Sequence, residues 1–375
     1  MLTSLLGIRL VLWMGKTVPL PAPYEAITAL TKVEVTQDVD GYDGFSLTFT
    51  VSKTKTFEYN LVEEGALAPF SLVVIGVALG LTPEVLMNGV ITHHQLSPSN
   101  EPGHSTLTLL GRDVGVMLSL EEKNASYPNQ PDFLIMSQII ASYAQFGLVP
   151  VPTPTTDFPI MLQRIPRQAE TDLAFLERLA RRNGFVFYTE PLTFGATQAY
   201  FGPENRLGLP QPALSMDMGT FTNVKSLSFS NDGLAAVGTR GSIVEPITKM
   251  AIPLPSLPSL RLPPLAASPA TARRTEQLRD SANLNPAQGA ASAVARVTTA
   301  PEAVRGQGEL DTVRYGSVLR ARKLVGVRGA GRKYDGFYYV RKVTHTLQKG
   351  QNPQYTQSFT LSREGTGSLV PVVRP

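Results

Sequence analysis

Cysteine is absent from this 375-residue chain. Its absence excludes a disulfide scaffold and thiolate metal sites, and it is compatible with assembly in the cytosol. Charged residues are also scarce, at 17%, whereas 42% of residues are hydrophobic and the chain holds 31 Gly and 30 Pro. This composition is typical of a folded, turn-rich β protein that buries weakly polar faces against partners. The length fits two or three domains.

Long hydrophobic runs are absent as well. The apolar run Phe70–Leu81 is interrupted by two glycines and is too short to span a bilayer, which takes ~20 residues. The apolar start of the chain resembles a targeting segment, but Arg9 interrupts it and no basic region precedes it. We therefore expect a strand at Ile8–Met14 and no membrane insertion.

Histidine is rare, and no metal or catalytic motif accompanies it. Two of the four histidines are adjacent in an expected strand, so they point to opposite faces and cannot chelate one ion. The four are His93, His94, His104 and His345. Glu121 and Glu122 are neighbours on one segment, which prevents them from flanking a sugar as glycosidase carboxylates do. The sequence predicts no catalytic, cofactor-binding or metal-binding residue and no cofactor.

The segment from Asp157 to Tyr188 predicts a strand, a helix and a second strand. Ile160 and Leu162 alternate with polar neighbours before Pro166. Thr171 or Asp172 is expected to cap the helix, and Asn183-Gly184 to end it. The buried stripe is expected to comprise Leu173, Leu176 and Leu179 or Ala180, with Glu177 and Arg181 paired on the solvent side and Phe185–Tyr188 returning as a strand.

Short strands separated by turn residues dominate the first 115 residues. Residues 45–51 alternate cleanly between apolar and polar side chains, after Asp40-Gly41 and Asp43-Gly44. The other expected strands are residues 32–39, 72–77, 84–93 and 105–110. Gly111-Arg112-Asp113 marks the exit to a mixed α+β segment. There Pro131-Asp132 opens a helix whose expected buried face is Leu134, Ile135, Ile139, Tyr143 and Phe146, closed by Gly147 and Pro150, and an irregular connection follows from Gly208 to Asn223.

The composition changes after residue 245. Seven prolines fall between Pro246 and Pro269, and the following Ala-rich stretch suits helices at Thr271–Ala282 and Pro286–Val297. A strand pattern resumes at Glu309, with expected strands Leu319–Val327, Gly336–Leu347 and Tyr355–Ser362. Residues 246–305 are therefore interpreted as an insertion or peripheral arm. Residues 300–375 carry a net charge of +8 and the rest −4, but the charges are dispersed, so nucleic-acid binding is not favoured.

Three phrases resemble the baseplate hub proteins of contractile injection systems: phage late control protein D, the N-terminal hub part of valine-glycine repeat protein G, and hubs of extracellular contractile injection systems. They are TDLAFLERLARRNGFVFY from Thr171, the strand-loop-strand run GVITHHQLSPSNEPGHSTLTLLGRD from Gly89, and YDGFYYVRKVTHTL with YTQSFTLSREG from Tyr334. The resembling blocks cover most of the chain.

The resemblance implies a β-rich α+β fold with two tail-tube-like antiparallel β-barrels, an intervening α+β domain and a Pro/Ala-rich insertion. The expected domains are a first barrel at 1–115, the middle domain at 116–222, a second barrel at 223–245 and 306–366, the insertion at 246–305 and a tail at 367–375. Thr31–Leu110 would supply one barrel, and Asn223–Phe229 with Glu309–Ser362 the other.

The function implied is non-enzymatic: a homotrimeric hub that connects a hexameric inner tube to a separate trimeric spike and contacts other baseplate components. Assembly is expected in the bacterial cytoplasm, within a phage-tail-like particle or virion baseplate. The alternative is a tail-associated protein that binds or degrades peptidoglycan or another envelope glycan. Three subunits with two barrels each would present six similar units to a hexameric tube.

Overall fold

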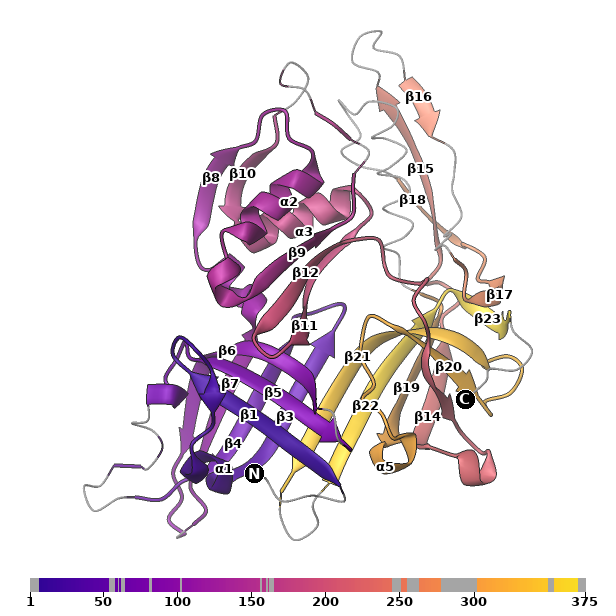
Figure 1. Cartoon of the computed structure of the whole chain (residues 1–375). Coiled ribbons are helices and arrows are strands. Elements are labelled where there is room, and N and C mark those ends of the chain that lie inside the picture. Colours follow the sequence, from indigo (N-terminus) through magenta and orange to yellow (C-terminus); the bar gives the residue numbers. More distant parts are fainter. Residues whose placement is uncertain are drawn as a thin grey trace.

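The computed structural model describes residues 7–53, 58–59, 61, 65–80, 83–101, 103–155, 157–159, 161, 165–244, 251–254, 263–277, 302–349 and 354–369, with side chains omitted for 239–244 and 251–254. One long β-sheet runs through both ends of the chain, and a smaller α/β part lies beside it (Figure 1). The β-rich fold class is confirmed. In the described ranges, no helix is long and apolar enough to cross a membrane.

The N-terminal part of the sheet, here the first β block, has buried and half-exposed residues in alternation along its strands. The strands at residues 30–38 and 44–50 pair with Val35 opposite Phe45. Alternate side chains of both strands pack into one hydrophobic core. The strand predictions for this block are confirmed. The elements are β1 (Ile8–Gly15), β2 (Leu20–Pro21), α1 (Tyr24–Ala29), β3 (Leu30–Asp38), β4 (Gly44–Thr50), η1 (Gly65–Leu67), β5 (Leu72–Leu79), β6 (Pro83–Ser97) and β7 (Thr106–Asp113).

The middle part packs two helices against a three-stranded sheet in which β12 pairs parallel with β9 and antiparallel with β11 (Figure 1). A separate hairpin-like pair, β8 and β10, lies on the other side of the helices. The elements are η2 (Val114–Ser119), β8 (Glu122–Ser126), α2 (Asp132–Ala141), η3 (Ala144–Phe146), β9 (Leu148–Pro152), β10 (Arg167–Thr171), α3 (Asp172–Arg182), β11 (Val186–Thr193) and β12 (Ala196–Gly202).

The predicted helix α3 is confirmed together with its ends. The Thr171 hydroxyl accepts a hydrogen bond from the Ala174 amide, and Gly184 after the helix has a left-handed φ of 67°. The expected stripe is buried at Leu176 and at the last turn, whereas Leu173 is only partly buried. The strand expected at Ile160 and Leu162 lies outside the described residues; the strand that leads into α3 is β10, which follows Pro166.

Helix α2 differs from expectation in the side chains that it buries. Leu134 is 48% exposed, so its assignment to the core was wrong. The buried face is instead Ile135, Met136, Ile139 and Ile140. These four lie on one stripe of a helix with 3.6 residues per turn, and Leu134 falls outside it because the stripe is centred one residue further along.

The C-terminal part of the sheet, here the second β block, completes the long sheet. Its elements are β13 (Gln211–Ser215), η4 (Gly219–Phe221), β14 (Val224–Asn231), β19 (Val304–Asp311), α5 (Thr312–Tyr315), β20 (Leu324–Arg328), β21 (Gly336–Gln348), β22 (Gln354–Arg363) and β23 (Gly365–Ser368). The connection expected to be irregular contains β13, which pairs parallel with β20. Because β13 buries only a short run ending in Ser215, it has no periodicity that a sequence could display.

The two β blocks are joined by direct strand pairing. β3 and β21 pair antiparallel from Asp38 opposite Lys342 to Lys32 opposite Gln348. The sheet order is therefore β14-β19-β22-β21-β3-β4-β7-β6-β5-β1-β2, with β20 and β13 branching from β21. The halves of the chain share one continuous hydrogen-bonded sheet.

The Pro/Ala-rich segment contributes strands where the structure describes it. β15 (Val237–Val244) pairs with β16 (Ala251–Leu254) and with β18 (Arg274–Gln277), while β17 (Ala266–Pro269) pairs with β23. The helix predicted from Thr271 is wrong over β18, because that stretch offers no apolar stripe for a helix to bury and its backbone bonds to β15 instead. The helix predicted at Pro286–Val297 lies outside the described residues. Leu265 and Ala266 are buried, so a purely peripheral arm does not describe them.

Candidate functional site: charged joints between the parts of the chain

The residues that the sequence analysis considered for catalysis are spread over the structure. His93 and His94 lie on β6, and His104 is an exposed loop residue 3.8 Å from Glu101. Glu121 and Glu122 are both exposed. Among the residues that the structure describes, no group of three His, Asp or Glu side chains is placed to hold a metal ion.

His345 is the histidine with the most unusual surroundings. It is fully buried on β21, and its Nδ1 lies 2.9 Å from the Tyr355 hydroxyl. Burial, helped by the positive charge of Arg320, lowers the pKa of His345 to about 3. The imidazole is therefore neutral at physiological pH and serves as a packed, hydrogen-bonded core group.

Asp113 stands where the first β block meets the middle part. Its side chain accepts hydrogen bonds from the Gly115 amide at 2.8 Å and from the Thr189 hydroxyl of β11. Burial and the nearby charge of Asp43 raise the pKa of Asp113 to about 6. Asp113 ends the motif that was expected to mark the exit of the first block, and its bond to Thr189 fixes that exit against β11.

Arg322 forms the first of three arginine joints. Its guanidinium donates to both carboxylate oxygens of Asp43, at 2.8 and 2.9 Å, and to the Asp38 carbonyl at 2.8 Å. It also lies over the Tyr188 ring, 4.6 Å from the ring centre. Because Asp43 belongs to the β3–β4 turn and Tyr188 to β11, one buried side chain of the second block contacts both other parts.

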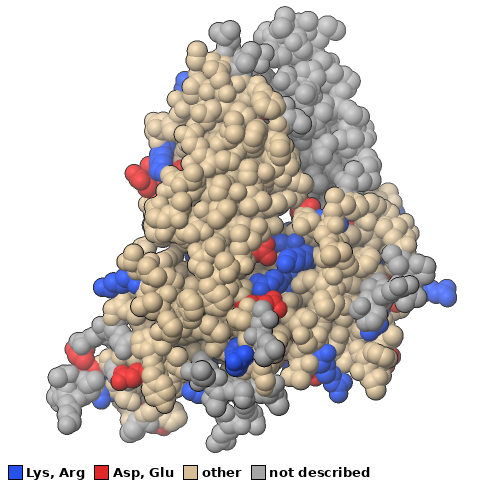
Figure 2. Space-filling model, viewed as in Figure 1, with Lys and Arg blue, Asp and Glu red and all other residues tan. Residues whose placement is uncertain are grey.

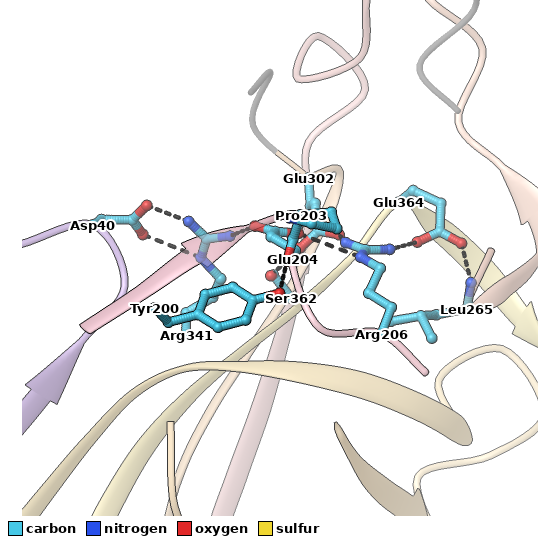
Figure 3. Close-up of polar contacts among 10 residues, drawn as sticks. All are labelled: Asp40, Tyr200, Pro203, Glu204, Arg206, Leu265, Glu302, Arg341, Ser362 and Glu364. Atoms are coloured by element: carbon cyan, nitrogen blue, oxygen red, sulfur yellow. Dashed lines mark hydrogen bonds and ion pairs between the residues drawn. The ribbon is translucent and has the colours of Figure 1, made fainter. Parts of the chain in front are cut away.

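Arg341 forms the second joint. It donates to the Asp40 carboxylate in the same β3–β4 turn and to Glu204, at 2.9 Å, in the segment that leaves β12 (Figure 3). Asp40 is largely exposed, so its pairing with Arg341 is weakened by solvent. Glu204 is much less exposed and is shared with the third joint.

Arg206 forms the third joint and contacts three glutamates. Its guanidinium donates to Glu204 at 3.3 Å, to Glu364 at 3.1 Å and to Glu302 (Figure 3). The Arg206 side chain is 1% exposed, and those of Glu302 and Glu364 are 2% and 5% exposed. Charges this deeply buried are tolerated only when they are paired and hydrogen-bonded.

The remaining oxygen atoms at this third joint are also satisfied. The Ser362 hydroxyl donates to Glu302, and the backbone amides of Leu265 and Ala266 donate to Glu364, the latter at 2.7 Å. Glu364 thereby holds the Pro/Ala-rich segment against the end of β22. The joint unites segments that are far apart in the sequence.

Electrostatics keep these arginines charged. Burial alone would lower the pKa of Arg206, but the charges of Glu302 and Glu204 more than offset it, and the pKa is raised. The pKa values of Arg322 and Arg341 are raised in the same way: their burial is outweighed by Asp43 for Arg322, and by Asp40 and Glu204 for Arg341. Permanently charged groups in fixed pairs position segments; they do not transfer protons at neutral pH.

A hollow of about 480 Å³ lies where the three parts meet, lined in part by Glu84, Tyr188, Glu190, Arg320 and Lys323. Figure 2 shows basic and acidic side chains gathered in the hollow below the α/β part. Arg320 is already engaged there, because it donates to the Val85 carbonyl at 2.8 Å and to Glu84 at 3.0 Å. An anionic ligand would have to compete with these internal contacts.

Sequence reasoning missed the joints because their members are remote in the chain. Arg206 and Glu364 are 158 residues apart, and Arg322 and Asp43 are 279 apart. The local signal is limited to a charged residue at the end of a strand, as at Glu364 after β22. That signal does not identify a partner.

No sequence-family description and no curated protein matches this chain. Solved structures do match its fold. A tail protein from Neisseria meningitidis superposes with a TM-score of 0.63 at 13% identity, covering 96% of this chain and 98% of that one. The 43 kDa tail protein of prophage MuSo2 from Shewanella oneidensis also gives 0.63, at 14% identity and 95% and 98% coverage.

A component of the Escherichia coli type VI secretion system, described as similar to the bacteriophage T4 tail proteins gp27 and gp5, gives a TM-score of 0.55. The identity is 15%, over 92% of this chain and 77% of that protein. At these identities the comparison establishes the fold: this chain has the fold of phage tail and type VI secretion proteins.

Proposed function

We propose that this protein is a structural, non-enzymatic baseplate hub. It would form a homotrimer that connects a hexameric inner tube to a trimeric spike, in a phage tail or another contractile injection system, and would contact further baseplate components. It would be assembled in the bacterial cytoplasm and function in the particle. The fold shared with tail proteins along nearly the whole chain supports this proposal.

The observation that carries the proposal is the β3–β21 ladder. It places the first β block and the second β block side by side in one sheet, with the backbone hydrogen bonding continuing from one block to the other. In the proposed hub each block is one tube-like unit. Three chains would then contribute six similar units, which is the number a hexameric tube can meet.

The arginine joints support the same reading. A hub must hold its two tube-like units at a fixed mutual angle, since six of them have to match one flat ring. Arg322 and Arg341 both bind the β3–β4 turn of the first block from the second block, and both also contact the middle part. Buried, multiply bonded arginines are suited to fixing orientation.

Native mass spectrometry of the purified protein, alone and with candidate spike and inner tube proteins from the same genome, tests the proposal. We expect a homotrimer that also captures the inner tube protein. A monomer in both conditions, or a stable hexamer, would contradict the hub. Zymography on peptidoglycan serves as a control for the envelope-degrading alternative: lytic activity from a monomer would favour that alternative instead.

A further inference from the structure

Residues 317–321, here the seam segment, connect α5 to β20 and lie at the seam where the two β blocks meet (Figure 1). A strand was expected to begin at Leu319, but β20 begins at Leu324. Val318 is buried in the core of the first block, whereas Leu319 and Ala321 are buried in the core of the second block. The seam segment therefore packs into both cores at once.

Glutamine side chains, in place of a neighbouring strand, bind the backbone of the seam segment. The amides of Leu319, Arg320 and Ala321 donate to three different glutamines, at 2.8, 2.8 and 3.2 Å. In the same order, these glutamines are Gln357 of β22, Gln211 of β13 and Gln37 of β3. A glutamine amide offers both donors and an acceptor, as a peptide group does, so it can replace a strand partner.

Two of these glutamines also donate back to the seam segment. Gln357 donates to the Ser317 carbonyl and Gln211 donates to the Arg320 carbonyl, both at 3.0 Å. In the described part of the chain, no hydrogen bond between two backbone groups joins residues 317–321 to a strand. Release of the segment therefore requires side chains to turn away, and it leaves the backbone ladders of the sheet intact.

Left-handed backbone conformations flank the seam segment on both sides. Gly316 has a φ of 71° and Arg322 has a φ of 63°. Glycine adopts this region freely, but a residue with a Cβ atom is strained there. Two bonds to the Asp43 carboxylate and one to the Asp38 carbonyl hold Arg322 in place. Such strain persists only where surrounding contacts enforce it, so opening of the segment would release it.

The outer side of the seam segment borders open space. Arg320, Arg322 and Lys323 line the hollow of about 480 Å³ between the second block and β11, which gives the segment room to move outward. Arg320 reaches from the segment to the first block, where it donates to the Val85 carbonyl at 2.8 Å and to Glu84 at 3.0 Å. The Glu84 side chain is 45% exposed, so solvent weakens this ion pair.

We infer that the seam segment is a latch: it opens and closes as one unit while the β3–β21 ladder stays paired, and its closed state fixes Arg320 and Arg322 against the first block. The inference goes beyond the proposed function and does not depend on it, because the latch needs only a single chain. Since Arg322 also lies over Tyr188 of β11, the closed latch joins all three parts of the chain. The latch thereby controls access from the hollow to the seam between the two cores.

Cysteine labelling measures the opening directly, because the chain has no cysteine of its own. Leu319→Cys places a thiol in the seam segment, and Val343→Cys places one at an equally buried position of the β3–β21 ladder. Under native conditions the first thiol should react with a small thiol reagent at least ~10-fold faster than the second, because local opening costs less than global unfolding. Equal rates would overturn the inference, since the segment would then open only when the whole chain unfolds.

Gln357→Glu and Gln211→Glu test whether the glutamines hold the latch closed. Each variant keeps an acceptor for the segment's amide but turns a carboxylate oxygen toward a backbone carbonyl, so a donated hydrogen bond is lost. Hydrogen exchange followed by mass spectrometry should show the amides of Leu319–Ala321 exchanging about 10-fold faster than in the unmodified protein, with the exchange of β21 unchanged. Gln307→Glu, at an exposed position of β19, is the matched control and should alter neither.

Acid should rescue Gln357→Glu, because a protonated carboxyl group donates to the Ser317 carbonyl again. Compared with the unmodified protein at each pH, the faster exchange should fade between about pH 8 and pH 5, since burial raises the pKa of a carboxyl group. The cross-strand neighbour His345 stays neutral there, with a pKa of about 3, and Arg320 stays charged. If both glutamate variants speed the exchange of β21 as much as that of the segment, the segment belongs to the cooperative core and the inference is wrong.

Discussion

The Arg322 joint and the Arg206 joint both hold distant segments of the chain together, but the two arginines bind different numbers of carboxylates. Arg322 meets one carboxylate, Asp43, and uses both of its oxygens. Arg206 meets three glutamates and is the cation that Glu302 and Glu364 share at that site. The first joint is a matched ion pair between two residues outside the strands, whereas at the second joint several segments meet at one arginine that three carboxylates share.

This difference determines how each joint should fail. Removing one member of a buried ion pair leaves an uncompensated charge, whereas removing both members of a matched pair can be nearly neutral. The Arg322 joint can be removed cleanly by a double substitution. The Arg206 joint cannot, because Arg206 bonds to three carboxylates and a single second substitution removes only one of them.

Arg206→Met should have the largest effect. It removes the buried guanidinium that Glu302 and Glu364 share, so the free energy of unfolding should fall by at least the ~3–5 kcal/mol typical of one broken buried pair. Urea denaturation at neutral pH measures it. Arg305→Met, at an exposed position of β19, is the control and should change stability by less than about 0.5 kcal/mol. A loss below about 1 kcal/mol for Arg206→Met would show that the joint is not needed.

Arg322→Met should cost about 3 kcal/mol, at the lower end of the same range, because Asp43 retains a hydrogen bond from the Asp38 amide at 2.8 Å. Combining it with Asp43→Asn should recover much of that loss in a double-mutant cycle. Arg206→Met combined with Glu302→Gln should recover far less. Equal recovery of unfolding free energy in the two double variants would show that the number of carboxylates at a joint does not determine how it fails.

Asp113→Asn tests a contact of another kind, in which burial destabilises the charged form of the carboxyl group. Its folded pKa of about 6 exceeds the ordinary value of 3.8, so the native state binds the proton more tightly than the unfolded state. This residue therefore contributes stability that grows as pH falls from about 7 to 4, by about 2 kcal/mol at 1.36 kcal/mol per pKa unit.

The asparagine variant should lack that gain. The difference in unfolding free energy, variant minus wild type, should therefore be most favourable to the variant at pH 8 and should decrease toward pH 4. Taking the difference cancels the opposite contribution of His345, whose lowered pKa makes stability fall as pH drops below about 6.5. A difference that does not change with pH would mean that Asp113 titrates normally.

Arg178→Ala should have the smallest effect. Arg178 pairs with Glu170 at 2.7 Å, but the Arg178 side chain is 48% exposed. Exposed pairs contribute at most about 1 kcal/mol, and salt screens them. The change in melting temperature should be small and should shrink further in high salt. A loss as large as that of Arg322→Met would break the link between burial and the strength of these contacts.

Much of the local structure could be predicted because it depends on neighbours in the sequence. The cap at Thr171, the buried Leu176 and the turn glycine Gly184 follow from helix chemistry alone, and β4 follows from strict alternation. Leu134 shows the limit of such patterns: a helix with apolar residues on several sides does not reveal which stripe meets the core.

The candidate site could not be predicted, for a different reason. Arg322 and Asp43 become neighbours only because β3 pairs with β21, and no local pattern specifies which strands from the two ends of a chain will pair. β13 and β18 were missed likewise, because short strands in parallel pairs take their stability from the partner strand and carry little periodicity of their own.

The β3–β21 ladder has a mechanical consequence. A hinge between the two halves would have to break a row of backbone hydrogen bonds together, since these bonds lie side by side from Asp38 to Lys32. Force or torque applied to one half is therefore transmitted to the other half through the backbone, and the two halves move as one rigid body. In the proposed hub, this stiffness would let the force of a contraction pass between the two halves without being absorbed by a flexible linker.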